Sequence, residues 1–411
     1  MRLWCVFEYY NKKEIPSVLV RSPGTIEAIA RGCNWLGYIC LPLWLSPAQF
    51  GSFSLLLALV LLVSAIGTAG QDRVILRYVS QVKPKDNNVR VSIAFITSLF
   101  FSILAFCFAY FALYWFNMAD KLIVHFGLVM LWGVSQTLYM LLVSLCRSLN
   151  QDQNFLMLRG MYGVVKLCTL VLIAATTQNV EYLVIAEAIL LLSVVCYSLF
   201  RFRCFFIWPA ASAIWKKSLL FGMPLILHIL AGASLGQLDK LMIANMLEAA
   251  ALGIYAFINS IAGGVFFIFA VVNIVYEAKV YQLGVTDKAE ILLRKMFKIS
   301  MLSAATVLLI ANLSLPHILE WVDKQNYYDI ETILILSLAF LIYPFYLQAN
   351  IRFSLKEKTK YIPIMTGTAA AANVALNLVF IPAYGITGAA VSTLLAYVIL
   401  VLLAQWTSRK I

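Results

Sequence analysis

Residues 235–261, LGQLDKLMIANMLEAAALGIYAFINSI, decide how the rest of the chain is organised. The stretch starts at the end of one apolar run, contains the charged pair Asp239-Lys240, crosses a few small residues and becomes apolar again at Ala251. Charges are costly in hydrocarbon, so a short charged segment between two apolar runs is typical of a hairpin between two membrane helices. The chain is therefore expected to cross a membrane on both sides of this stretch.

The composition extends this expectation to the whole chain. Of the 411 residues, 63% are hydrophobic and 12% are charged, and the mean hydropathy is +0.89. Soluble domains carry about 25% charged residues. The alternating ten-residue strands of a membrane β-barrel do not occur in the sequence. The composition therefore predicts an all-α polytopic membrane protein.

Twelve apolar runs of about the length of a membrane helix are separated by charged residues or by proline and glycine. They lie at residues 26–45, 50–70, 91–115, 122–145, 157–177, 182–200, 218–237, 251–275, 298–316, 331–350, 361–381 and 385–405. The last two are divided by the sequence IPAYG, in which Pro382 interrupts the helix and Gly385 allows the chain to reverse. We therefore expect about twelve transmembrane helices.

The basic residues alternate with these helices in a way that supports the count. An even number of helices places both termini on one side, and nearly all of the 31 lysines and arginines fall in the loops of that side. The opposite loops contain only Lys121, Lys240 and Lys324, and Lys166 lies inside a helix. Because lysine and arginine accumulate in cytoplasmic loops, both termini are expected in the cytoplasm. Orientation thus explains the net charge of +12 without a nucleic-acid partner.

The two halves of the chain resemble each other at a shift of 202 residues. Residues 47–54, PAQFGSFS, and residues 249–256, AAALGIYA, share a glycine, an aromatic residue and a small residue in phase. The same shift places Arg77 opposite Lys279. Two six-helix repeats of the same topology imply two bundles around a central cleft with the substrate site between them. The expected parts are a cytoplasmic segment at residues 1–24, an N-terminal six-helix bundle at 25–205 and a C-terminal six-helix bundle at 206–411.

The sequence contains no HExxH, P-loop or DxD motif, and its eight cysteines stand singly without a neighbouring histidine cluster. A GxSxG match at residues 232–236, GASLG, falls inside the apolar run 218–237 that is predicted to be a membrane helix. The predicted outer loops are also too short to fold as a domain. We therefore expect no enzyme, metal site, disulfide or cofactor, and any driving force must come from an ion gradient, the gradient of the substrate or a partner.

Several short motifs, in order along the chain, resemble Wzx-type flippases of polysaccharide repeat units, which are known as polysaccharide biosynthesis proteins. The resemblance rests on Asp239-Lys240 with residues 252–256, LGIYA, on Phe50-Gly51 at the first hairpin, and on residues 384–390, YGITGAA. This family belongs to the same superfamily as the multidrug-and-toxin extrusion transporters. The charged stretch before Ser22 departs from the family pattern.

The resemblance implies a function. Members of the family move undecaprenyl-diphosphate-linked oligosaccharide repeats from the cytoplasmic to the periplasmic leaflet of the bacterial inner membrane, for O-antigen of lipopolysaccharide or for capsule. It further implies membrane lipid as a partner, and a polysaccharide polymerase and chain-length proteins as further partners. A cation-coupled multidrug exporter is an alternative, although such a site would favour acids in the bundle core, and a membrane glycan polymerase is another.

The candidate site residues are ionisable groups at membrane depth, where each needs a partner, water or a function. Lys166 is expected to meet the diphosphate from within the cleft, or to snorkel or pair with a neighbouring acid. Arg31 has the same two interpretations, and Glu27 lies one turn before it as a possible i,i+4 partner. Glu187 is a candidate for coupling to protons or sodium, unless it pairs with Lys166 or lies near the outer surface. His228 is a second titratable candidate, or is simply hydrogen-bonded.

Two further groups of charged residues lie near the predicted helix ends. Asp239 and Lys240 are expected to form an outer gate or to bind sugar, or else to be an interfacial ion pair. Cations near the cytoplasmic mouth are expected to capture the lipid diphosphate by charge-assisted hydrogen bonds, or only to set the topology. These cations are Arg77, Arg147, Arg159 and Lys279.

Overall fold

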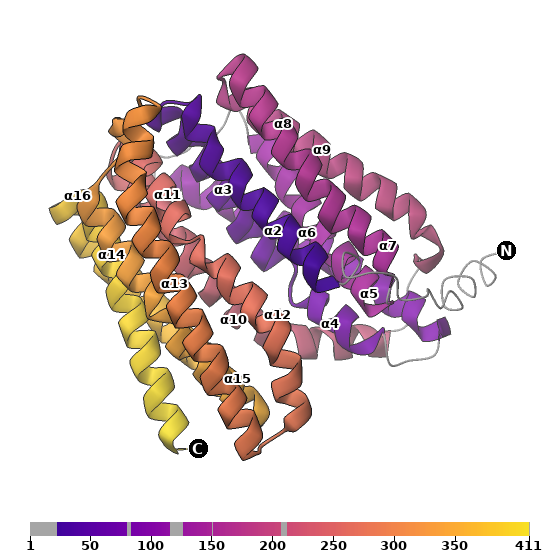
Figure 1. The fold of residues 1–411 in the computed structure, drawn as a ribbon. Coiled ribbons are helices and arrows are strands. Elements are labelled where there is room, and N and C mark those ends of the chain that lie inside the picture. The colour runs from indigo at the N-terminus through magenta and orange to yellow at the C-terminus, as the bar shows by residue number, and fades with distance from the viewer. Residues whose placement is uncertain (1–22, 80–83, 116–125, 150, 207–211, 411) are drawn as a thin grey trace. The chain divides into compact units, whose positions relative to one another are not determined.

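The protein is all-helical in the residues that its structure, a computed structural model, describes (Figure 1). These are residues 23–79, 84–115, 126–149, 151–206 and 212–410, so almost all of the predicted N-terminal segment lies outside them. The elements up to residue 205 are α2 (Pro23–Cys40), η2 (Leu41–Leu43), α3 (Pro47–Gly67), α4 (Gln71–Tyr78), α5 (Pro84–Trp115), α6 (Phe126–Ser148), α7 (Asp152–Phe155), η5 (Leu156–Met161), α8 (Tyr162–Thr177), α9 (Val180–Arg201) and η6 (Arg203–Phe205). The elements that follow are α10 (Ser212–Met246), α11 (Ala249–Ala262), α12 (Val265–Leu283), α13 (Asp287–Trp321), η7 (Gln325–Tyr327), α14 (Ile330–Leu341), α15 (Tyr343–Leu355) and α16 (Tyr361–Lys410).

Nine helical segments in the described part of the chain are long and apolar enough to cross a membrane. One of them, α16, is interrupted at Gly385, whose φ of 60° and ψ of −136° are not helical, so α16 supplies two spans. The two predicted runs that remain fall on α2, with 18 residues, and α10, with 35 residues. The prediction of an all-α polytopic membrane protein with about twelve helices is confirmed.

The helices repeat along the chain at the predicted shift of 202 residues. This shift carries the start of α3 at Pro47 onto the start of α11 at Ala249. It carries the start of α5 at Pro84 to within one residue of the start of α13 at Asp287. The start of α9 at Val180 falls three residues before the break in α16. The repeat therefore extends through most of the chain and is not limited to the hairpin motif.

Two predicted helix ends are wrong. Helix α10 continues to Met246, nine residues beyond the predicted end at residue 237, and so includes the pair Asp239-Lys240. Helix α13 contains Pro316, which was predicted to end it, and continues to Trp321. A proline lacks only its own N–H donor, so a helix that is packed on both sides can continue past it at some cost in stability.

Proximity of Cα atoms divides the chain into two compact units, which are treated separately below. Unit 1 contains the described residues up to Ala30, together with Leu59–Leu170 and Glu181–Leu230. Unit 2 contains Arg31–Ala58, Val171–Val180 and the chain from Ala231 onwards. Each unit includes residues from both halves of the sequence. The predicted division into bundles at residue 205 stays a prediction.

Small and hydroxylated residues bring the helices of unit 1 close together. Ser64 on α3 donates a hydrogen bond of 3.1 Å to the carbonyl oxygen of Gly133 on α6. The hydroxyls of Ser102 on α5 and Thr137 on α6 lie 2.8 Å apart in the interior. In hydrocarbon, helices gain little from hydrophobic burial, so close packing and hydrogen bonds between helices stabilise such contacts.

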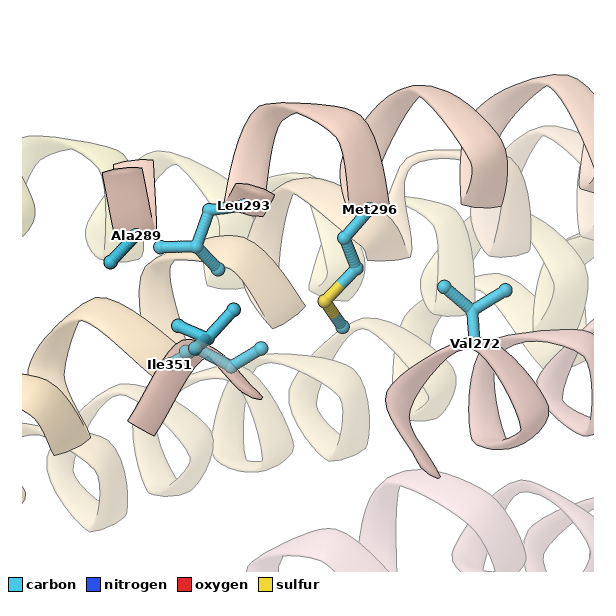
Figure 2. Close-up of a cluster of buried hydrophobic side chains, with 6 residues drawn as sticks. Val272, Ala289, Leu293, Met296 and Ile351 are labelled. Carbon is cyan, nitrogen blue, oxygen red and sulfur yellow. The ribbon is translucent and has the colours of Figure 1, made fainter. Parts of the chain in front are cut away.

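Unit 2 has a packed apolar cluster where α12, α13 and α15 meet (Figure 2). Leu293 and Met296 of α13 point toward Ile351 of α15, and Val272 of α12 lies beside them in the same layer. These side chains are at most 7% exposed, so their dispersion contacts are nearly complete. The cluster holds the ends of the three helices together.

Candidate functional site

Lys166 and Glu187 form a buried ion pair inside unit 1. Lys166 lies on α8 and Glu187 on α9, and the Lys166 Nζ is 2.8 Å from the Glu187 Oε1. The Lys166 side chain is 10% exposed and the Glu187 side chain 1%. From the sequence, this pairing was one of the alternatives for both residues. The structure brings them together, and both residues lie within predicted spans where an isolated charge would be costly.

Arg159 forms a second ion pair in the same unit. Its guanidinium donates two parallel hydrogen bonds to the Glu27 carboxylate on α2, from Nε at 2.9 Å and from the terminal nitrogen at 2.8 Å. This bidentate geometry is the strongest arrangement that an arginine and a carboxylate can form. Arg159 lies in η5, a π-helical turn. Such wide turns are frequent at functional sites.

Two tyrosines lie between the pairs. The Arg159 guanidinium lies 5.8 Å from the centre of the Tyr139 ring, and the rings of Tyr139 and Tyr162 are 5.2 Å apart. Tyr162 precedes Lys166 by four residues on α8, so the two side chains share one face of that helix. The Tyr139 hydroxyl donates to the backbone oxygen of Leu158 at 2.9 Å. The two ion pairs and the two tyrosines thus form one continuous polar layer, which we call the ionic layer of unit 1.

The ionic layer contains two cations and two carboxylates, so its formal charge is balanced. Balance lowers the cost of keeping four ionised groups at membrane depth. An anionic ligand could reach Lys166 only by competing with Glu187. The roles of Lys166 and Arg159 in substrate binding, and of Glu187 in ion coupling, stay predictions.

The charged pair of the outer hairpin lies in the interior of unit 2. Asp239 is 2% exposed and Lys240 is 9% exposed. The Tyr255 hydroxyl on α11 donates a short hydrogen bond to one carboxylate oxygen of Asp239, and the Lys240 backbone N–H donates to the other at 2.8 Å. The Lys240 Nζ donates to Gln237 at 3.1 Å. These bonds explain why α10 continues through the pair, and the role of the pair as an outer gate stays a prediction.

The remaining predicted cations are exposed and lie on separate helices. Arg31 lies on α2 in unit 2, Arg77 ends α4, Arg147 ends α6 and Lys279 lies on α12. His228 falls on α10, but its side chain lies outside the described residues. The structure therefore joins Arg159 to the ionic layer and leaves the other cations at helix ends and surfaces.

One acid near these cations lies outside the predicted spans. Asp72 on α4 is within 3.4 Å of the Arg73 Nε. Burial raises the pKa of the Asp72 carboxyl, and the neighbouring Arg73 cation opposes this shift. Asp72 is therefore held in a protein interior next to the predicted cytoplasmic cations, a position that the sequence pattern did not indicate.

Two cavities were not predicted. A cavity of about 270 Å³ lies in unit 1 along η5, α8 and α9, with Met157, Met161 and Tyr197 in its wall. A polar pocket of about 710 Å³ opens in unit 2 where α13 begins. In the wall of that pocket Glu290 accepts hydrogen bonds from Arg352, so the negative charge of Glu290 is balanced by the positive charge of Arg352. Cavities depend on which helices are neighbours, and the periodicity of a single chain does not reveal this.

Comparison with known structures shows the same fold in membrane transporters. The chain is similar to the lipid II flippase MurJ in an inward closed conformation, with a TM-score of 0.73, 14% identity and coverage of 93% of this chain and 87% of that one. It is similar to an inward-facing multidrug resistance MATE family transporter of the MOP superfamily, with a TM-score of 0.62, 14% identity and coverage of 99% and 97%. A MOP superfamily transporter from Pyrococcus furiosus gives a TM-score of 0.51, 15% identity and coverage of 95% and 94%. These levels of identity show the fold alone.

Sequence comparison gives a more specific result. No curated protein sequence matches the chain significantly. The family model described as polysaccharide biosynthesis protein matches residues 24–275, which is more than half of the chain and includes the ionic layer and the hairpin at Asp239-Lys240. The chain therefore belongs to the polysaccharide biosynthesis protein family.

Proposed function

We propose that this protein translocates undecaprenyl-diphosphate-linked oligosaccharide repeat units from the cytoplasmic to the periplasmic leaflet of a bacterial inner membrane, for O-antigen or capsular polysaccharide. The observation that carries the proposal is the ionic layer of unit 1, in which Lys166 and Arg159 each pair with a carboxylate, in a member of this family. Membership of the family and the transporter fold support the same function.

The chemistry of such a substrate requires help inside the membrane. A diphosphate with several sugars is charged and strongly hydrated, so it cannot enter hydrocarbon without replacing its lost water contacts. An ammonium and a guanidinium offer charge-assisted hydrogen bonds to phosphate oxygens, and arginine does so in a bidentate manner. Lys166 and Arg159 supply these two groups from one unit.

The ion pairs suggest how binding and release are balanced. We infer that the substrate diphosphate displaces Glu187 from Lys166. When the diphosphate leaves, Glu187 pairs with Lys166 again. This exchange would prevent Lys166 from holding the substrate permanently, and Glu187 stays the candidate for coupling to protons or sodium. Arg31, Arg77, Arg147 and Lys279 are proposed to attract the diphosphate, because they are exposed cations.

One observation favours the alternative of a cation-coupled exporter of small molecules. Asp239 and Glu187 are both buried carboxylates, whereas the sequence indicated only Glu187 as a buried acid. The family model that matches residues 24–275, however, is that of polysaccharide biosynthesis proteins. A polysaccharide-repeat flippase therefore remains the better-supported function.

Deletion of the gene followed by complementation tests the proposal. Deletion should cause complete lipid-linked repeats to accumulate on the cytoplasmic leaflet, with loss of long-chain surface polysaccharide. The native gene should restore both properties, and so should Lys358→Ala, a matched control at an exposed loop lysine. Lys166→Ala should not, at equal amounts of protein in the membrane.

Two outcomes would contradict the proposal. Single repeats that reach the outer surface but are never polymerised would indicate a polymerase. Unchanged surface polysaccharide with altered drug sensitivity would indicate an exporter.

A further inference from the structure

Two helices of unit 2 cross closely at two glycines that occupy equivalent positions of the repeat. Gly51 lies in the first turn of α3 and Gly253 in the first turn of α11. A Cβ atom added to Gly51 would lie 1.9 Å from the backbone oxygen of Ala249, and one added to Gly253 would lie 1.8 Å from that of Pro47. The contact is reciprocal, because the same shift of 202 residues carries Gly51 to Gly253 and Pro47 to Ala249. It is therefore a contact between corresponding residues about an approximate two-fold axis.

No other residue fits at this crossing. Both obstructing atoms are backbone oxygens, so neither can move aside as a flexible side chain would. The glycine Cα hydrogens face these oxygens in the weak Cα–H···O geometry that recurs where membrane helices cross closely. Even one methyl group at either position must push the two helices apart.

Side chains around the crossing join the two repeats by single, reversible contacts. Tyr327 donates a hydrogen bond of 3.1 Å to the backbone oxygen of Leu45, and its ring contacts Phe50 and Phe257 at centroid distances of 6.2 Å and 5.3 Å. The Trp35 indole donates to the Ser260 oxygen at 2.7 Å. The hydrogen bonds and ring contacts named here join neutral groups, so breaking them separates no formal charges.

We propose that the crossing of Gly51 and Gly253 is the reversible closure of the predicted outer side, which makes these glycines positioning residues of the transport cycle. A carrier that alternates its access must close this side while it is open to the cytoplasm. The first helical turns of α3 and α11 lie at that side by the charge pattern of the loops. The crossing would then form in one state of the cycle and separate in the other. The role of the crossing in transport rests on the proposed function. Whether the crossing opens and closes does not, because it can be measured without a substrate.

Distances between spin labels test the closure. Ala48 and Glu248 are exposed and lie next to the two obstructing residues, so cysteines placed there in a background without native cysteines can carry labels. In lipid nanodiscs, pulsed electron paramagnetic resonance should show a short-distance population. Gly51→Ala and Gly253→Ala should each lower that population by about tenfold, which corresponds to about 1.4 kcal/mol, and should shift it to longer distances.

A second glycine crossing provides the matched control. In unit 1 a Cβ on Gly222 would lie 2.6 Å from the Ala69 backbone oxygen. Gly222→Ala should destabilise the protein and leave the label distance in unit 2 unchanged. A static packing role for Gly51 predicts one distance population in the native protein and one slightly longer population in Gly51→Ala, with no separate open state in either, and that result would overturn the proposal.

A third variant keeps the test decisive if the glycine variants do not fold. Tyr327→Phe removes only the hydrogen bond to Leu45 and should also lengthen the label distance, whereas an unchanged distribution would overturn the closure. The distances are measured without substrate. A protein that closes as described but moves no lipid-linked glycan would therefore contradict the proposed function and not this inference.

Discussion

Replacing Glu187 by glutamine leaves the Lys166 ammonium buried without its carboxylate. At 2.8 Å, and at the effective dielectric constant of about 20 that describes protein sites, two unit charges attract by about 6 kcal/mol. Desolvation of both groups cancels much of this, and removal of one partner of a buried pair costs about 3–5 kcal/mol in practice. We therefore expect Glu187→Gln to destabilise the protein by about 3 kcal/mol.

A double-mutant cycle separates the ion pair from the packing around it. Lys166→Met with Glu187→Met removes both charges and retains most of the volume, so it should cost within about 1 kcal/mol of the native protein. Thermal unfolding in lipid nanodiscs measures the effect, since about 3 kcal/mol corresponds to a fall in the unfolding temperature of several degrees in a large domain. If the double variant were as unstable as the two single changes added together, the two side chains would not be coupled and the ionic layer would be wrong. If it were stable and inactive, the pair would have a role in transport beyond stability.

Changes at four further residues test other parts of the account. Arg159→Ala should lower surface polysaccharide, whereas Arg159→Lys should retain part of it because only the bidentate geometry is lost, as immunoblots of the glycan would show. Arg31→Ala should reduce glycan without removing protein from the membrane, and normal glycan would exclude Arg31 from substrate binding. Gly133→Ala should lower the unfolding temperature by overpacking, at a cost of about 1–3 kcal/mol, because its added Cβ would lie 2.2 Å from a buried ring. Tyr255→Phe should cost about 1–3 kcal/mol by leaving Asp239 without its hydroxyl donor, and an unchanged unfolding temperature would exclude that bond.

Most of the fold was predictable because membrane helices can be recognised by the length of their apolar runs and by the charges of the loops between them. The runs at residues 361–381 and 385–405, separated by Pro382 and Gly385, correspond to the two halves of α16. The shift of 202 residues was visible in one hairpin and holds for most helices. The extension of α10 to Met246 was not predictable. It depends on Tyr255 of another helix, whose hydroxyl donates a hydrogen bond to Asp239 and so lowers the free-energy cost of burying that carboxylate.

The sequence identified most of the charged residues of the candidate site, but it did not show which of them form ion pairs with each other. Lys166 and Glu187 stand out in the sequence because they are ionisable residues within apolar runs. Glu27 was a possible partner of Arg31 one turn away, and in the structure it binds Arg159 on a distant segment. Helical spacing shows which residues share a face of one helix, whereas a pair between helices depends on their packing. The glycine crossing needed the same information, although Gly51 and Gly253 are both visible in the repeat.

Reconstitution of the purified protein tests the central claim most directly. Liposomes would contain a fluorescent undecaprenyl-diphosphate-linked oligosaccharide in both leaflets, and a membrane-impermeant quencher would report the fraction that reaches the outer leaflet with time. The account predicts that the native protein makes nearly all of the fluorescence accessible and that Lys166→Ala slows this process strongly at equal protein content. Accessibility limited to about half of the label, as in liposomes without protein, would contradict the proposed translocation.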